Sequence, residues 1–252
     1  MSQPWTSLSR SALAAAFGTA ARLRGGRPLH PSGLVFDAHL RLHGTARRWG
    51  APFLDEPMEL RGMARLSRSI GVPWPLPDIL GIAFRWQQAG ATAELLLATT
   101  GRSALGRRLL RPATRWTGLY TSLFPYRTGE RRLLLGALLH APVPVPATFD
   151  ALTRAVAAGP LTLELLAADP SGPWQLLGQA RLFAPASPDA DRPTRFNPLR
   201  HPVPGLRPAG WPNEVRDAAY TAAQRVPDAG TDDRPAYDTE YSQPVREGTS
   251  HA

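Results

Sequence analysis

The stretch GLVFDAHLRLHG, residues 33–44, indicates the fold class of this chain. Apolar residues occupy every second position from Leu34 to Leu42. Because side chains of a β-strand point alternately to its two faces, this pattern predicts a strand with one buried face. The folded part of the chain therefore begins as β-structure, close to Leu29.

Similar short runs recur along the next 140 residues. They are LGIAFRW (80–86), AELLLA (93–98), RLLLGALL (132–139), LTLELLA (161–167) and WQLLGQARL (174–182). Turn signals separate them, among them Gly90, Gly101 and the Asp169–Pro173 segment. Repeated short strands joined by turns predict an antiparallel barrel or sandwich.

Helices are expected at three places. Residues 1–24 predict an N-terminal helix or arm, 149–159 a helix ended by Gly159, and 213–226 a helix capped by Asn213. Residues 184–210 are rich in proline and predict an extended surface segment. The organisation is thus an arm (1–24), one domain (25–226) and an acidic tail (227–252), which we expect to be disordered.

Charge and composition limit the chemistry. The chain has no cysteine and no lysine, so thiolate ligands and lysine Schiff bases are excluded. All 29 basic residues are arginines; the tail carries a net charge of −4, which leaves +13 on residues 1–226. A domain this basic suits an anionic ligand or a polyanionic surface. The arginines are scattered without a nucleic-acid-binding motif, so no nucleic-acid partner is expected.

No segment predicts a membrane span. The Ala-rich run at 8–23 is too short to cross a bilayer and is flanked by arginines. We expect a soluble, cytoplasmic protein. Nucleotide-binding and hydrolase motifs are absent from the sequence, and the spacing of the six histidines does not favour a zinc site.

Arg216 and Tyr220 lie four residues apart on the helix predicted at 213–226. Residues at this spacing share a helix face. A nearby guanidinium favours the phenolate form of a tyrosine, which is the form that binds ferric iron. Taken alone, the pair indicates an ordinary contact on a helix face rather than a ligand site.

The context of this pair resembles the catalase superfamily. FNPLRHPVPGLRP (196–208), followed by Arg216 and Tyr220, resembles the segment that brings in the proximal tyrosine. RPLHPSG (27–33) resembles the strand of the distal histidine. The segments between them, in matching order, are ARLSRSIG (64–71), LPDILGIAFRW (76–86), AELLLATTG (93–101) and SLFPYRTG (122–129). The resemblance covers about residues 25–225.

The resemblance implies an α+β fold, an antiparallel β-barrel of catalase type with flanking helices and a C-terminal helix. Catalases proper are much longer, so this chain would be a core-barrel relative. It implies a haem b cofactor with Tyr220 as iron ligand, supported by Arg216. Arg27 and Arg65 would bind the haem propionates. His30 would be the distal acid–base, oriented by Ser67.

One departure from the family bears on the reaction. The distal asparagine should follow the AELLL run, but Ala98, Thr99 and Thr100 stand there. That amide helps to hold peroxide, so efficient disproportionation of hydrogen peroxide is not expected unless Thr99 or Thr100 supplies a hydroxyl.

Three functions remain open. The favoured one is a haem-dependent peroxidase or peroxygenase-like oxidoreductase acting on peroxide and a small organic donor. The second is a haem-binding sensor or carrier without turnover. The third is a haem-less catalase-fold protein with another apolar or anionic ligand in its barrel. A homo-oligomer is compatible with each.

Overall fold

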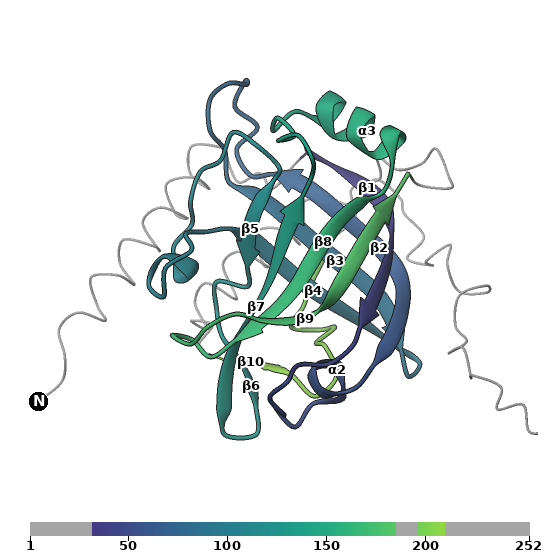
Figure 1. Cartoon of the computed structure of the whole chain (residues 1–252), viewed down its shortest axis with the longest axis vertical. Helices are drawn as coiled ribbons and strands as arrows, with labels where there is room; N and C mark the ends of the chain where they lie inside the picture. Colours follow the sequence, from purple (N-terminus) through teal and green to yellow (C-terminus); the bar gives the residue numbers. More distant parts are fainter. Residues whose placement is uncertain (1–31, 185–195, 210–252) are drawn as a thin grey trace, which may run out of the picture.

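The alternating stretch at 33–44 forms the first strand of a closed barrel, β1 (Ser32–Leu42), in the computed structural model of the chain (Figure 1). The structure describes residues 32–184 and 196–209. Phe36, Ala38 and Leu40 of β1 are buried, as the period of two requires.

Seven further strands complete the barrel. They are β2 (Met58–Arg68), β3 (Leu80–Gln88), β4 (Ala91–Thr99), β5 (Gly118–Thr121), β7 (Arg131–His140), β8 (Leu161–Ala168) and β9 (Gln175–Phe183). The strands pair antiparallel in this order, and β9 pairs with β1 to close the barrel. The short strands β6 (Tyr126–Thr128) and β10 (Arg207–Pro208) extend the sheet beside β7. The alternative of a sandwich is therefore settled in favour of a barrel.

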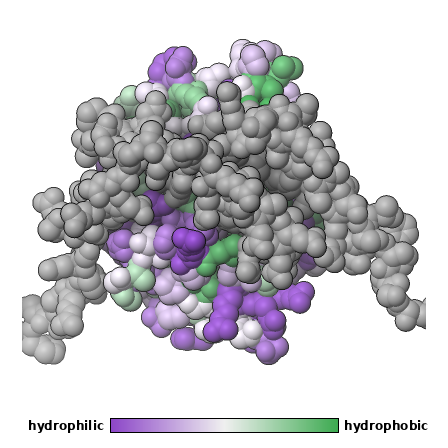
Figure 2. All heavy atoms as spheres, turned by 180° about the vertical axis from the view of Figure 1, so that it is seen from behind, coloured by the Kyte–Doolittle hydropathy of each residue, from purple (hydrophilic) through white to green (hydrophobic). Residues whose placement is uncertain are grey.

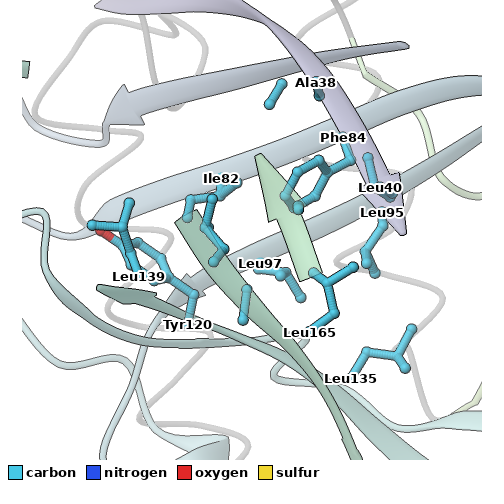
Figure 3. Close-up of a cluster of buried hydrophobic side chains, with 14 of the residues drawn as sticks. Ala38, Leu40, Ile82, Phe84, Leu95, Leu97, Tyr120, Leu135, Leu139 and Leu165 are labelled. Atoms are coloured by element: carbon cyan, nitrogen blue, oxygen red, sulfur yellow. The ribbon is translucent and has the colours of Figure 1, made fainter. Parts of the chain in front are cut away.

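Large side chains fill the barrel interior. Figure 3 shows Ile82, Phe84, Leu95, Leu97 and Tyr120 converging there, and each is at most 4% exposed. Leu40 of β1, Leu135 and Leu139 of β7, and Leu165 of β8 join them. Eight-stranded barrels of this size are commonly filled by side chains. A ligand of this chain would therefore bind on the outside of the barrel.

Two helices accompany the barrel in the described ranges, α2 (Pro52–Asp55) and α3 (Phe149–Ala158). The helix predicted at 149–159 is confirmed: the Thr148 hydroxyl accepts a hydrogen bond from the Ala151 amide, and Gly159 ends the helix at φ +158°. A 3₁₀ turn, η1 (Gly106–Arg108), lies in the loop between β4 and β5.

Two features differ from the sequence expectation. The inner positions of strand β2 between Leu60 and Leu66 are Gly62 and Ala64, so its apolar signal is weak. Within 184–210, residues 196–209 form turns and a two-residue strand with Val203 and Leu206 buried, rather than an extended surface segment. The predicted helices at 1–24 and 213–226 and the tail 227–252 lie outside the described residues.

Candidate functional site

The outer face of strands β1–β4 carries the described candidate residues. In β2, Ala64 and Leu66 point into the core, so Arg65 and Ser67 point outward. The strand registers place four residues side by side in each of two rows on this outer face. One row is Gly33, Ser67, Gly81 and Ala98, and the other is Val35, Arg65, Ala83 and Leu96.

The composition of these two rows is unusual for the outside of a barrel. An antiparallel sheet normally presents polar residues on the face opposite its core. Here six of the eight residues are Gly, Ala, Val or Leu, and the polar residues are Arg65 and Ser67. Most of the apolar side chains are small, so the face is shallow.

Arg65 lies against Gly33 of the neighbouring strand. A Cβ atom added at residue 33 would lie 2.7 Å from the Arg65 Cζ and 2.8 Å from the Leu66 carbonyl oxygen. The absence of a side chain at Gly33 therefore makes room for the guanidinium. Arg65 is 8% exposed, and Ser67 is 5% exposed. Alternate residues of one strand stand roughly 7 Å apart, so β2 presents a cation and a hydroxyl side by side.

The two threonines after the AELLL run differ in direction. The Thr99 hydroxyl accepts a hydrogen bond of 3.2 Å from the Leu80 amide and belongs to the core side of β4. Thr100 follows on the side of Leu96 and Ala98, at the edge of the outer face. Its hydroxyl is buried and makes no hydrogen bond within the described residues. Thr100, rather than Thr99, therefore lies on the side of the sheet that carries Arg65 and Ser67.

A buried ion-pair cluster borders this face. Glu94 of β4 is 0% exposed and accepts hydrogen bonds from the Arg85 Nε at 2.8 Å and from the backbone amide of Asn197. The His201 Nδ1 lies 3.2 Å from the Glu94 Oε1, and the Glu94 amide donates to the His201 carbonyl at 2.8 Å. The Arg85 guanidinium also lies over the Phe196 ring, with its Cζ 4.6 Å from the ring centroid. We call this set the Glu94 clamp.

The Glu94 clamp fixes the FNPLRHP segment to the barrel. A buried carboxylate is tolerated when charged and hydrogen-bonding partners surround it, and the segment supplies two of them. Asn197 closes the turn itself, since its Oδ1 accepts from the amides of Leu199 and Arg200 at 3.2 Å each. The segment then continues to β10, which pairs with β6. The chain therefore leaves the described region at Ala209 in a fixed position.

Of the six predicted site residues, the structure brings Arg65 and Ser67 together on one face. His30 and Arg27 precede β1, and Arg216 and Tyr220 follow Ala209; all four lie outside the described residues. The Glu94 clamp was missed by the sequence reading. A lone glutamate inside the apolar AELLL run was the signal that could have revealed it.

Tyr120 is excluded as a phenolate ligand. It is fully buried in the core, where its hydroxyl donates to the Trp116 carbonyl at 2.6 Å. Burial raises the pKa of Tyr120 well above its usual range, which keeps the hydroxyl protonated.

Among the described residues, His, Asp and Glu do not gather in any group of three that could hold a metal ion. Within the same ranges, the helices are too short to span a membrane. Comparison with models of known protein families and with curated proteins finds no match for this chain.

Proposed function

We propose that this protein is a small catalase-like haem protein that binds haem b on the outer face of β1–β4. In this proposal it uses a peroxide to oxidise small organic donors. The observation that carries the proposal is the pair of largely apolar rows, one of which contains Ser67 and the other Arg65. It adds to the order of motifs from RPLHPSG to Tyr220 along the sequence.

The described residues fit such a cofactor. Small side chains at Gly81, Ala83 and Ala98 would let a planar ring lie against the sheet. Forked guanidinium donors suit the carboxylates of propionates, the role proposed for Arg65 with Arg27. When bound, haem supplies the redox chemistry of its iron, with the phenolate of Tyr220 as proposed ligand.

The roles of the protein residues follow from their acid–base chemistry. His30 would take the proton from a peroxide and return it to the leaving oxygen. Ser67 would hold the imidazole of His30 through its other ring nitrogen. Arg216 would keep Tyr220 as phenolate, since an adjacent positive charge lowers a tyrosine pKa.

The missing asparagine limits the reaction. Asn197, one of the two asparagines in the chain, uses its side chain to close the turn on the Glu94 clamp, and Asn213 lies outside the described residues. Thr100 offers a hydroxyl at the edge of the face instead. We therefore propose oxidation of organic donors that clearly exceeds oxygen release from hydrogen peroxide.

A haem sensor or carrier without turnover is the second candidate. The absence of the distal asparagine favours it, because that amide helps to hold peroxide. The third candidate, with a ligand inside the barrel, is disfavoured because side chains such as Phe84 and Tyr120 fill the interior.

The test uses the full-length chain titrated with haemin. A Soret band that saturates at one haem per chain supports either haem function, and peroxide-dependent dye oxidation then selects the enzyme. A titration without a saturable Soret band would contradict the proposal. Dye oxidation no faster than that of free haemin would exclude the enzyme and favour the haem sensor or carrier.

A further inference from the structure

Three loops meet at the end of the barrel that also carries α3: 69–79, 100–117 and 141–148. Asp78 and Ala113 exchange backbone hydrogen bonds of 3.0 and 2.8 Å between the first two loops. The Trp116 amide donates a hydrogen bond of 2.7 Å to the Val145 carbonyl, which joins the second loop to the third. We call this continuous surface the loop rim.

Large apolar side chains project from the loop rim into solvent. Trp74 is 52% exposed, Leu76 57% and Val143 73%, with Ile70 beside them at 45%. Figure 2 shows hydrophobic residues among hydrophilic ones at this end of the molecule. Trp74 also lines a shallow hollow of about 360 Å³ together with Pro75, Thr114, Arg115, Pro144 and Pro146. Clustered exposed apolar groups of this kind mark interaction surfaces.

Hydrogen bonds within loop 69–79 and an ion pair with Arg68 hold the backbone from which Trp74 and Leu76 project. The carboxylate of Asp78, 1% exposed, accepts hydrogen bonds from the amides of Ile70 at 2.8 Å and Gly71 at 2.6 Å. Arg68 pairs with the same carboxylate at 3.6 Å. Pro73, Pro75 and Pro77 further restrict the loop. Folding back to bury Trp74 and Leu76 would break this framework.

The exposed charges of the loop rim are all positive. Its exposed charged residues are Arg102, Arg108, Arg111 and Arg115, and its single acid is the buried Asp78. The neighbouring helix α3 adds Asp150 and, one turn later, Arg154. The rim therefore combines exposed apolar side chains with a net positive charge.

We propose that the loop rim docks on the surface of an anionic phospholipid bilayer. Trp74, Leu76 and Val143 enter the interfacial region, where tryptophan is favoured, and Arg111 and Arg115 meet lipid phosphates. A second copy of the chain fits less well, because a symmetric contact would bring the same arginines together. Nucleic acid fits less well because Trp74 alone among the exposed apolar side chains named above offers a stacking surface for bases, whereas leucine, valine and isoleucine offer none.

The test is sedimentation of the full-length protein with vesicles of phosphatidylcholine alone or with about 30% phosphatidylglycerol. Binding is expected to the anionic vesicles, with a decrease between 0.15 and 0.5 M salt. The double substitution Trp74→Ser/Leu76→Ser should weaken it about tenfold or more. Arg111→Gln/Arg115→Gln should weaken it by roughly fivefold per arginine.

The matched control is Leu176→Ser/Arg132→Gln, which removes an exposed leucine and an exposed arginine elsewhere on the barrel and should leave binding unchanged. Thermal melting of every variant establishes that it folds. Equal binding to neutral vesicles, or unchanged binding of the Trp74→Ser/Leu76→Ser variant, would overturn the proposal. Self-association in analytical ultracentrifugation that this same variant abolishes would overturn it too, in favour of a contact between copies.

Discussion

The guanidinium of Arg65 on β2 lies against the backbone of Gly33 on β1, in space that any side chain at residue 33 would occupy. The cation of Arg65 thereby lies close to an apolar sheet face. Arg65 itself is 8% exposed. Both residues belong to segments, RPLHPSG and ARLSRSIG, that were singled out from sequence alone. The contact between Gly33 and Arg65 therefore joins the RPLHPSG and ARLSRSIG segments at the proposed site.

The first prediction concerns this contact. Gly33→Ala should lower the free energy of unfolding by about 1–3 kcal/mol, because the added methyl group meets the Arg65 guanidinium and the Leu66 carbonyl. The cost should be smaller in an Arg65→Ala background, as a urea-denaturation double-mutant cycle would measure. An equal cost in both backgrounds would show that Gly33 does not act through Arg65.

The second prediction concerns the Glu94 clamp. Glu94→Gln removes a charge that faces Arg85 and His201 in a buried setting, so it should cost about 3 kcal/mol of unfolding free energy. It should also open residues 196–209 to proteolysis. Glu59→Gln is the matched control, since Glu59 is half exposed beside Arg41, and such a pair contributes about 0–1 kcal/mol. Similar losses in the two variants would contradict the role of the clamp.

The sequence predicted six of the eight barrel strands and the helix at 149–159, because their apolar residues repeat with the period of the element. Strand β2 was not predicted because Gly62 and Ala64, which add little to an apolar pattern, occupy inner positions. Gly62 is required there, since a Cβ would lie 2.1 Å from the Arg85 carbonyl oxygen. Strand β5 has four residues and is too short to show a period.

The sequence predicted individual residues of the candidate site, but not their arrangement in space. Placing Arg65 and Ser67 on an apolar outer face required the strand registers, which no local pattern encodes. The Glu94 clamp joins residues more than 100 positions apart in sequence. Sequence periodicity carries no information on such contacts.

The third prediction is that the acidic tail is dispensable. Residues 227–252 hold few apolar groups, so ordering them would cost more conformational entropy than burial could offset. Truncation after residue 226 should leave the melting temperature and haem occupancy unchanged. A large loss of either quantity would mean that the tail packs on the domain.

The fourth prediction concerns the proposed acid–base. His30→Ala should reduce peroxide-dependent dye oxidation about 10²-fold or more while haem content stays the same. His43→Ala is the control, because His43 lies beyond the other end of β1. Activity that is indifferent to the loss of His30 would contradict its assignment. Vigorous oxygen release by the unmodified protein would mean that another group, such as Thr100, replaces the missing amide.

The most direct test of the haem proposal is the absorption spectrum of the haem-loaded protein beside that of its Tyr220→Phe variant. The unmodified protein should show the spectrum of a tyrosinate-bound ferric haem. The variant should lose that spectrum, whereas the tail variant Tyr241→Phe should keep it. An unchanged spectrum and haem content in Tyr220→Phe would contradict the proposed ligand and the catalase-like site built around it.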